Sequence, residues 1–222
     1  MSAPLKIFMN YHSQPSRAVL ALCLFNKIPF TLEEVDIYKA VHFKPDFKKI
    51  NPLRQIPVID DNGFLLSESH TIMRYLCDSR QLPDHWFPKD LKKRALVDRY
   101  LDWHHANTRR ATKYFQASFK ELYKPGWITW STNDEVDGMA RAFKRIDEVY
   151  LENCKYLDSD EMSIADISAV CEIMNIKTTE FDFSPYPKME EWLKRCMAHE
   201  EMKEVHKNFF NFMEGVKKAR NN

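Results

Sequence analysis

The first 35 residues alternate between strand-like and helix-like patterns, and this order restricts the chain to few folds. Residues 5–9 alternate apolar side chains with Lys6, as in a half-buried strand, and residues 18–25 form an apolar helical run that Pro15 introduces. A second strand pattern, rich in apolar and β-branched residues, covers residues 30–35. A helix between two strands predicts a βαβ unit whose strands run parallel.

A hairpin and another helix are predicted next. The Asn62-Gly63 pair separates the apolar runs 56–59 and 64–66, and Asn-Gly between apolar runs is a strong hairpin signal. Residues 71–76 continue as a helix with an apolar stripe. The resulting order, βαβ followed by ββα, is the thioredoxin-like arrangement, so we expect an α/β domain of this kind that ends near residue 80.

The remainder of the chain contains helical patterns and no clear strand pattern. Residues 82–88 are bracketed by prolines, which is typical of a linker. Residues 91–123 run for 33 residues without Gly or Pro, as expected of a long helix, and further helical patterns cover residues 135–152 and three shorter stretches up to about residue 218. We therefore expect an all-α helical-bundle domain. The predicted boundaries are 1–82 for the thioredoxin-like domain, 83–88 for the linker and 89–222 for the all-α domain.

One motif in the helical part has a structural explanation. The segment from Ser163 to Asp166 has the form of a capping box, with Asp in place of Glu or Gln, and it predicts the start of a helix. Helix nucleation explains every residue of the motif, so we assign it no role in binding or catalysis.

Charge and composition exclude several classes of function. The chain has 33 Lys and Arg against 32 Asp and Glu, so no net field recruits nucleic acid or an anionic membrane. The N-terminus has no apolar signal core, and no apolar run approaches the roughly 20 residues of a membrane span, so we expect a cytoplasmic protein without a membrane partner. The five cysteines are widely spaced and no histidine pair has i,i+4 spacing. We therefore expect no disulfide framework and no metal.

The Ser67-Glu68-Ser69 segment follows a predicted strand and begins a predicted helix. A carboxylate beside a hydroxyl at such a junction can bind an amino-acid-like ligand. Glu68 would pair with an α-ammonium, and Ser69, with its backbone N–H at the helix start, would receive an α-carboxylate. Together with Ile56-Pro57 ten residues earlier, this pattern predicts a glutathione site.

The junction between the first strand and the first helix carries Tyr11-His12-Ser13-Gln14-Pro15, which contains no cysteine for dithiol exchange. The Ser13 hydroxyl can donate a hydrogen bond to a bound thiolate, and the helix N-terminus adds positive potential that lowers the pKa of a ligand thiol. Taken alone, a Ser before Pro is more often a helix cap. Only its combination with Pro57, Glu68 and Ser69 favours catalysis.

On these motifs the chain resembles the cytosolic glutathione transferases, and most closely the theta class. The matching segments span both predicted domains: Ser13 to Ala18, Asn51 to Leu53 with Ile56-Pro57, Ser67 to Ser69, Asp84 to Pro88, and Ser163 to Asp166. Glu68-Ser69 with Pro57 is typical of glutathione-binding members as a group, whereas the Ser-Gln-Pro-Ser-Arg-Ala segment points to theta.

The resemblance implies a role for each matching residue. Ser13 would be the catalytic hydroxyl, bonded to the glutathione sulfur. Ile56 would bond the cysteinyl moiety through its backbone, and Pro57 would follow a cis peptide bond. The other residues implied to line the glutathione site are Gln14, His42, Gln55, Glu68 and Ser69, with His42 facing the glycine carboxylate. Trp103 and Arg109 lie on the predicted long helix that would face the electrophile. For Arg109, an exposed helix arginine without substrate contact is the alternative.

The implied activity is glutathione S-transfer. Bound glutathione, the co-substrate, would be held as a thiolate that attacks a small hydrophobic electrophile or reduces an organic hydroperoxide, a detoxification reaction that needs no metal. The resemblance also implies a homodimer. Two alternatives stay open: a non-catalytic interaction module with the same fold, and a glutathione-dependent dehalogenase that differs only in the acceptor pocket.

Overall fold

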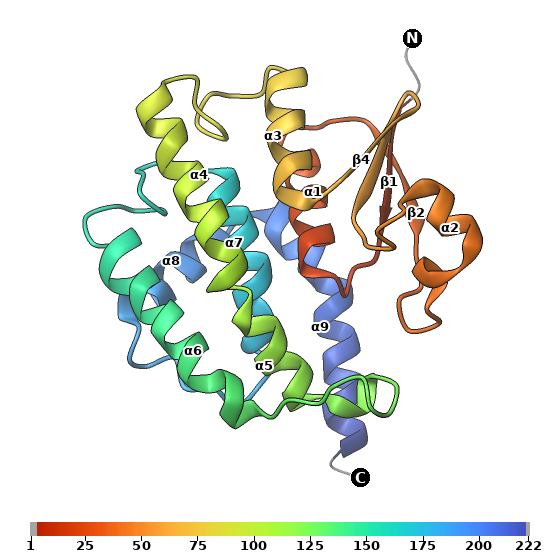
Figure 1. The fold of residues 1–222 in the computed structure, drawn as a ribbon. Coiled ribbons are helices and arrows are strands. Elements are labelled where there is room, and N and C mark those ends of the chain that lie inside the picture. Colours follow the sequence, from red (N-terminus) through yellow and green to blue (C-terminus); the bar gives the residue numbers. More distant parts are fainter. Residues whose placement is uncertain (1–3, 221–222) are drawn as a thin grey trace. The chain divides into compact units, whose positions relative to one another are not determined.

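The computed structural model describes residues 4–220, which divide into two compact units. Unit 1 combines the described residues up to Leu82 with those from Glu200 onward, and unit 2 spans Pro83–His199. Figure 1 labels the α-helices and most of the strands of both units. No helix within residues 4–220 has the length and the apolar character needed to cross a membrane.

Unit 1 is built on a mixed sheet. Its described strands are β1 (Leu5–Met9), β2 (Phe30–Glu34), β3 (Val58–Asp61) and β4 (Phe64–Ser67). They lie in the order β2-β1-β3-β4, with β2 parallel to β1, and with β3 antiparallel to both β1 and β4. The helices α1 (Gln14–Phe25) and α3 (Ser69–Ser79) complete the order βαβ then ββα. This confirms the predicted thioredoxin-like class of the N-terminal part.

Alternation along β1 divides its side chains between the two faces of the sheet. Ile7 is fully buried on the face that α1 and α3 cover. Phe8 lies on the opposite face, where its ring meets that of Phe47 edge to face, with 6.4 Å between the ring centres. Phe47 belongs to α2 (Pro45–Ile50) and packs with Val58 in a small second core. The short helix α2, which follows a 3-10 turn at Val41–Phe43, therefore covers the other face of the sheet.

The predicted Asn62-Gly63 turn closes the hairpin between β3 and β4. Both residues have positive φ, 56° for Asn62 and 91° for Gly63, and the Gly63 N–H donates to the Asp60 carboxylate at 2.7 Å. Positive φ at both central positions is the geometry of a two-residue type I′ turn, which matches the twist of the flanking strands. The Asn-Gly signal therefore predicted the hairpin and its position correctly.

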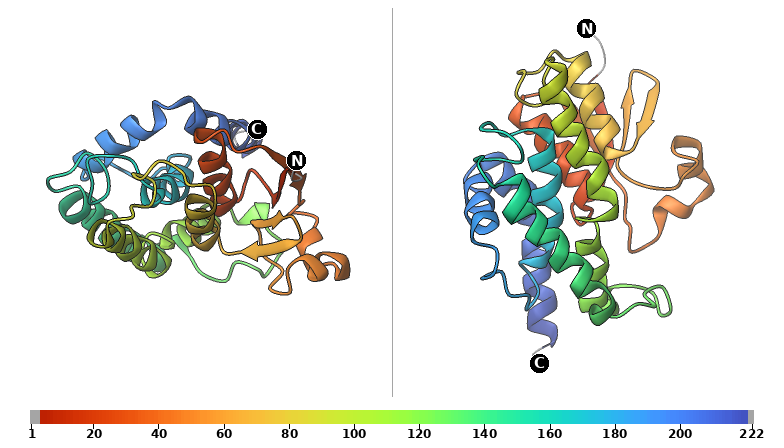
Figure 2. Two further views of the ribbon diagram at one scale, coloured as in Figure 1. Left: turned by 90° about the horizontal axis from the view of Figure 1, so that it is seen from above. Right: turned by 60° about the vertical axis from the view of Figure 1, so that its left-hand side comes forward.

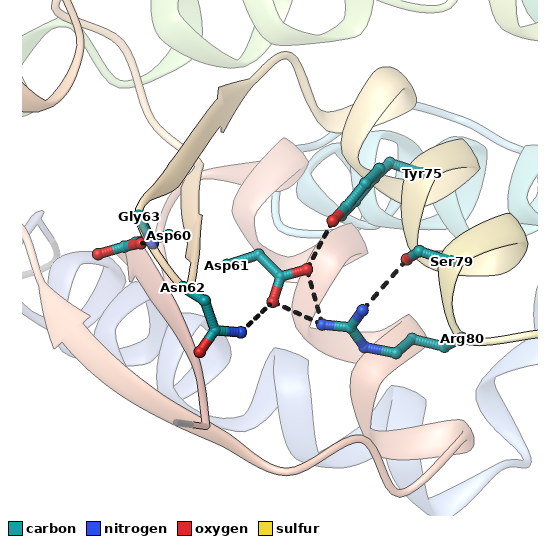
Figure 3. Close-up of polar contacts among 7 residues, drawn as sticks. All are labelled: Asp60, Asp61, Asn62, Gly63, Tyr75, Ser79 and Arg80. Carbon is teal, nitrogen blue, oxygen red and sulfur yellow. Dashed lines mark hydrogen bonds and ion pairs between the residues drawn. The ribbon is translucent and has the colours of Figure 1, made fainter. Parts of the chain in front are cut away.

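Asp61 ties this hairpin to α3 (Figure 3). The Arg80 Nη2 atom donates to both oxygens of Asp61, at 2.7 and 2.8 Å, and the Tyr75 hydroxyl donates to Oδ2 at 2.6 Å. Burial raises the pKa of Asp61, but the hydrogen bonds from Tyr75 and Arg80 and the charge of Arg80 outweigh burial and lower it. The carboxylate is therefore ionised at neutral pH and holds the strand pair to the helix.

Arg80→Met is expected to destabilise the protein by about 1–2 kcal/mol, because the nearly buried Asp61 carboxylate loses its cationic partner. We expect a value at the lower end of this range, because 33% of the Arg80 side chain is exposed and solvent screens its interaction with Asp61. The pKa of Asp61 lies below its unfolded value, so its contribution is present above about pH 4 and is lost as the pH falls. Urea unfolding at neutral pH and below about pH 4 measures both effects. An equal deficit at the two pH values would contradict the ion-pair explanation.

Unit 2 contains only helical elements among its described regular segments. They are α4 (Leu91–Ala106), α5 (Arg110–Ser118), a 3-10 turn (Lys120–Leu122), α6 (Thr132–Arg145), a π-helical turn (Ile146–Tyr150), α7 (Ile164–Ile176) and α8 (Pro187–Met197). The central helix α7 is buried along almost its whole length and packs against α4, α5 and α8 (Figure 1). This confirms the predicted all-α class of this part of the chain.

The predicted single helix over residues 91–123 is wrong. The helix breaks between Ala106 and Arg110. In this break, Asn107 donates from Nδ2 to the Trp103 carbonyl at 2.9 Å. A polar side chain that bonds to a nearby carbonyl offers the backbone an alternative to helical pairing. The absence of Gly and Pro was therefore not sufficient to predict one continuous helix.

The last helix, α9 (Glu200–Arg220), belongs to unit 1. It packs against α1, and Figure 2 shows both helices from two further directions. The predicted all-α domain, 89–222, includes α9, whereas by its contacts α9 belongs to unit 1, where it packs against α1. The predicted domain boundaries themselves stay a prediction.

Asp166 connects three parts of unit 2. Its Oδ2 accepts the Ser163 N–H at 2.8 Å, which completes the capping box at the start of α7 and confirms that prediction. Its Oδ1 accepts the Leu157 N–H and the Trp192 Nε1–H, both at 2.9 Å, and so joins α7 to the preceding loop and to α8. Burial raises the pKa of Asp166 to about 6, although these hydrogen bonds favour the carboxylate. The sequence pattern did not indicate the contacts with Leu157 and Trp192.

Candidate functional site

The strand register brings three predicted site segments to one edge of the sheet. Phe8 of β1 pairs with Val58 of β3, and Val58 pairs with Ser67 of β4, so these residues form one row across the sheet. Because β3 is antiparallel to its neighbours, the chain after β1, the chain before β3 and the chain after β4 meet at the same edge. Those segments carry Ser13, Ile56-Pro57 and Glu68-Ser69.

Ser13 lies at the N-cap position of α1, with φ −86° and ψ 116°. Its N–H donates to the Asn10 carbonyl at 3.0 Å, and its carbonyl accepts the Arg17 N–H at 3.0 Å. Its side chain makes no capping hydrogen bond, and no other described residue bonds to the hydroxyl. Pro15, at the second helical position, has no N–H to donate, which removes one of the two usual capping partners. The geometry therefore leaves a half-buried hydroxyl at a helix N-terminus with its hydrogen-bonding capacity unused.

Glu68 and Ser69 lie at the start of α3. Glu68 is the exposed N-cap residue, and its φ of 70° and ψ of 106° are a conformation that costs a non-glycine residue about 1–3 kcal/mol. Within residues 4–220 its carboxylate has neither a hydrogen bond nor an ion pair. Ser69 is buried and is the first helical residue, so its N–H is one of those that a helix leaves without an internal partner. A strained backbone, an unused carboxylate and a helix N-terminus coincide here, which suits an amino-acid-like ligand.

The loop before β3 carries Gln55, Ile56 and Pro57. The Ile56–Pro57 peptide bond is cis, as the family resemblance implies. Asn51 shapes this loop, because its Nδ2 donates to the Gln55 carbonyl at 2.8 Å and its Oδ1 accepts the Leu53 N–H at 3.0 Å. None of the described residues bonds to the Ile56 backbone, so its N–H and C=O are open to a ligand.

Gln14 and His42 follow the strands β1 and β2, which end at this same edge. Gln14 is buried as the first residue of α1. His42 lies in the 3-10 turn after β2, with its ring centre 4.1 Å from that of Phe43. Burial lowers the pKa of His42, so its ring is mainly neutral at neutral pH. Its Nδ1 is buried and has no partner in the described part of the chain.

Trp103 and Arg109 lie in unit 2, and the broken helix separates them. Trp103 belongs to α4, and its ring centre lies 5.1 Å from that of Tyr150. Arg109 stands at the N-cap of α5 and donates from Nη1 to Glu172 Oε2 at 3.0 Å, with 40% of its side chain exposed. Glu172 is almost fully buried and also accepts the Thr112 hydroxyl. Arg109 therefore neutralises a buried carboxylate, a role that sequence reasoning missed because the pairing of Glu172 on α7 with Arg109 depends on how the helices pack.

Residues 4–220 contain no group of three or more His, Cys, Asp and Glu side chains that could hold a metal ion. The five cysteines, all within these residues, form no disulfide bond. Burial raises the pKa of Cys23, in α1, to about 12, so this thiol is unreactive at neutral pH.

Comparison with known proteins gives a consistent family. Residues 12–79 match the family model described as glutathione S-transferase, N-terminal domain, and residues 131–200 match the one described as glutathione S-transferase, C-terminal domain. The chain is 34% identical to glutathione S-transferase T1 of Arabidopsis thaliana, over 97% of this chain and 93% of that protein. It is 32% identical to human glutathione S-transferase theta-1, over 87% of this chain and 82% of that protein.

Solved structures agree with these matches. Human glutathione transferase theta-2, in complex with glutathione and an unknown ligand, is similar with a TM-score of 0.86 and 29% identity, over 97% of this chain and 91% of that chain. The apo form of human glutathione S-transferase T1-1 has a TM-score of 0.81 and 30% identity, over 91% and 88%. The chain therefore belongs to the glutathione S-transferase family, among its theta-class or theta-like members.

Proposed function

We propose that unit 1 binds glutathione and that the chain transfers it to electrophiles. The observation that carries the proposal is that two groups at one edge of the sheet, the Ser13 hydroxyl and the Glu68 carboxylate, have no partner among the described residues. Glutathione offers a thiol to Ser13, and its γ-glutamyl end offers an α-ammonium to Glu68 and an α-carboxylate to the Ser69 N–H. Family membership and the glutathione bound in the human theta-2 structure support this ligand.

The other predicted residues complete the proposed site. The Ile56 backbone would bond the cysteinyl moiety through its N–H and C=O, in the manner of a neighbouring antiparallel strand. Pro57 directs the chain into β3, and Gln55 lies next to the ligand backbone. A neutral His42 would donate one ring N–H to the glycine carboxylate. Gln14, buried beside Ser13, would line the site near the sulfur.

Ser13 acts on the thiol of the bound ligand. Its hydroxyl donates a hydrogen bond to the sulfur, and the N-terminus of α1 adds positive potential, so both favour the thiolate and the thiol proton leaves to solvent. The thiolate then attacks an electrophilic carbon, a C–S bond forms, and the leaving group departs with the bonding electron pair. The protein supplies the field, and glutathione supplies the nucleophile.

The acceptors we propose are small hydrophobic electrophiles, with organic hydroperoxides as side substrates. In the second case the thiolate attacks an oxygen, the O–O bond breaks to release an alcohol, and a second glutathione converts the sulfenic product to a disulfide and water. Trp103 and Arg109 are the residues proposed to contact the acceptor. On the family resemblance we also propose a cytoplasmic homodimer, which light scattering tests because a species of single-chain mass would refute the dimer.

Glu68→Gln is expected to raise the Kd for glutathione at least about tenfold, because a charge-assisted pair with the α-ammonium becomes a neutral contact. The variant keeps the size of the side chain and the positive φ of the backbone. Isothermal titration calorimetry measures the change, and Glu33→Gln is the matched control, since Glu33 is an exposed carboxylate on β2. Equal affinity in wild type and Glu68→Gln would contradict the assigned role.

Turnover separates the proposed function from its alternatives. Wild-type protein that binds glutathione and conjugates an alkyl halide or an epoxide supports transfer. Binding without turnover on halides, epoxides and hydroperoxides would favour the non-catalytic interaction module. Halide release at a rate far above that of epoxide conjugation would favour the dehalogenase.

A further inference from the structure

Every residue of the turn between β1 and α1 is held, partly by groups from α9. Asn10 donates from Nδ2 to the Val35 carbonyl at 3.2 Å and accepts the His12 N–H at Oδ1 at 2.9 Å. The first bond fixes the turn to the end of β2, and the second closes the turn on itself. The second half, from Tyr11 to Ser13, is restrained by Arg17 and by aromatic side chains of α9.

Arg17 is fully buried one turn into α1. Its Nη1 donates to the Tyr11 carbonyl at 2.7 Å, and its guanidinium lies over the Phe209 ring of α9, 4.5 Å from the ring centre. A guanidinium on an aromatic face is attracted by the ring quadrupole, and its planar fork fixes the direction of its acceptor. Phe209 therefore positions Arg17, and Arg17 positions the Tyr11 carbonyl two residues before Ser13.

His12 makes a second connection to α9. Its ring stacks on Phe212, with 4.3 Å between the ring centres, and its Nδ1 lies 3.2 Å from the Tyr38 hydroxyl. Burial and the charge of Arg17 lower the pKa of His12 to about 4, against the opposing effect of Asp36. A neutral, stacked imidazole directly before Ser13 therefore restrains the turn at neutral pH.

Arg17 also brings a permanent positive charge to the start of α1. Burial and then this charge lower the pKa of His206, on α9, to about 3, as they do for His12. A buried cation is screened less by solvent than an exposed acid, so its field extends to the first turn of the helix. The other charged or titratable groups around the turn are Glu34, Asp36 and Tyr38 from the β2 side, Tyr11 itself, and Glu204 and His206 from α9.

From these contacts we infer that Arg17 is a positioning residue for Ser13, and that α9, through Phe209 and Phe212, holds the turn that presents the Ser13 hydroxyl. The inference rests on the proposed function, because it concerns how bound glutathione loses its thiol proton. It assigns the last helix of the described chain a part in thiolate formation at a turn near the start.

The test titrates the thiol of bound glutathione, by the ultraviolet absorbance of the thiolate, in full-length variants. Arg17→Gln is expected to raise that thiol pKa by about one pH unit and to lower kcat about tenfold, while the Kd for glutathione changes less than about threefold. Arg17→Lys keeps the positive charge but lacks the planar guanidinium. Its thiol pKa and its kcat should therefore lie between those of wild type and Arg17→Gln. Phe212→Leu is expected to lower kcat about threefold.

Phe210→Leu is the matched control, because Phe210 lies on the same helix and contacts His206 and Phe209. It should titrate and turn over as wild type does. A purely structural role would lower the melting temperatures of the Arg17 and Phe212 variants without moving the thiol pKa or kcat, and that result overturns the inference. If Arg17→Gln does not fold, the thiol pKa and kcat of Phe212→Leu are compared with those of Phe210→Leu. Equal values in these two variants would overturn the inference. Failure of wild type to bind millimolar glutathione would instead overturn the proposed function.

Discussion

Ser13→Ala is expected to lower kcat for glutathione conjugation about 100-fold, while the Kd for glutathione changes less than about threefold. The Ser13 hydroxyl bonds to none of the described residues, so its removal disturbs no contact among them. A hydrogen bond to a charged acceptor contributes about 1.5–3 kcal/mol, which corresponds to a thiol pKa higher by about one to two pH units. Steady-state kinetics together with thiolate absorbance across pH measure both quantities.

Ser16→Ala is the matched control for this variant. Ser16 lies three residues further along α1, its side chain is fully buried, and its hydroxyl has no partner among the described residues. Removing a buried hydroxyl without a partner leaves stability unchanged or raises it. We therefore expect wild-type kinetics from Ser16→Ala. If Ser13→Ala keeps the low pKa of the bound thiol, the N-terminus of α1 stabilises the thiolate and the Ser13 hydroxyl does not.

Asp166→Ala is expected to destabilise the protein by about 3–5 kcal/mol, because it leaves four buried donors without their carboxylate acceptor. Those donors are the backbone N–H groups of Leu157 and Ser163, the Ser163 hydroxyl and the indole N–H of Trp192. Denaturant unfolding measures the change. The control is Asp160→Ala, an exposed carboxylate in the loop before α7, with an expected effect within about 0.5 kcal/mol.

The pH dependence of Asp166→Asn follows from the raised pKa. The folded value of about 6 lies above the unfolded value near 4, so the folded state favours the protonated acid. The contribution of this group to stability is therefore present below about pH 4 and is lost as the pH rises through about 6. The deficit of Asp166→Asn relative to wild type should shrink over this interval, by an amount on the order of 2–3 kcal/mol. A deficit that grows with pH would show that the hydrogen bonds outweigh burial.

The sequence predicted the features that depend on local pattern. Alternation along residues 5–9 and the Asn62-Gly63 pair were sufficient for the strands and the hairpin, because both depend on neighbouring residues. The capping box at Ser163 was predicted for the same reason. The break at Asn107 was not, because a single Asn inside an otherwise helical pattern does not show where its side chain will bond.

The candidate site was predicted as residue types and not as geometry. A Ser before Pro fits both a cap and a ligand-binding hydroxyl, and the missing capping bond of Ser13 is visible only in three dimensions. The positive φ of Glu68 has no sequence signal, since a Glu at a helix start is ordinary in composition. The burial of Glu172 under Arg109 likewise depends on which helices pack together, and an amphipathic pattern does not specify its partner.

The return of α9 to unit 1 has a consequence for synthesis on the ribosome. Chains emerge from the N-terminus at about 5–20 residues per second, and compact units form as their segments become available. All of unit 2 emerges before Glu200, whereas unit 1 needs residues from both ends of the described chain. Arg17, buried under Phe209 in the finished protein, therefore remains uncovered throughout the translation of unit 2. The segment around Arg17 thus leaves the ribosome before unit 2 and is among the last to reach its final packing, and the turn between β1 and α1 is completed only after α9 has docked.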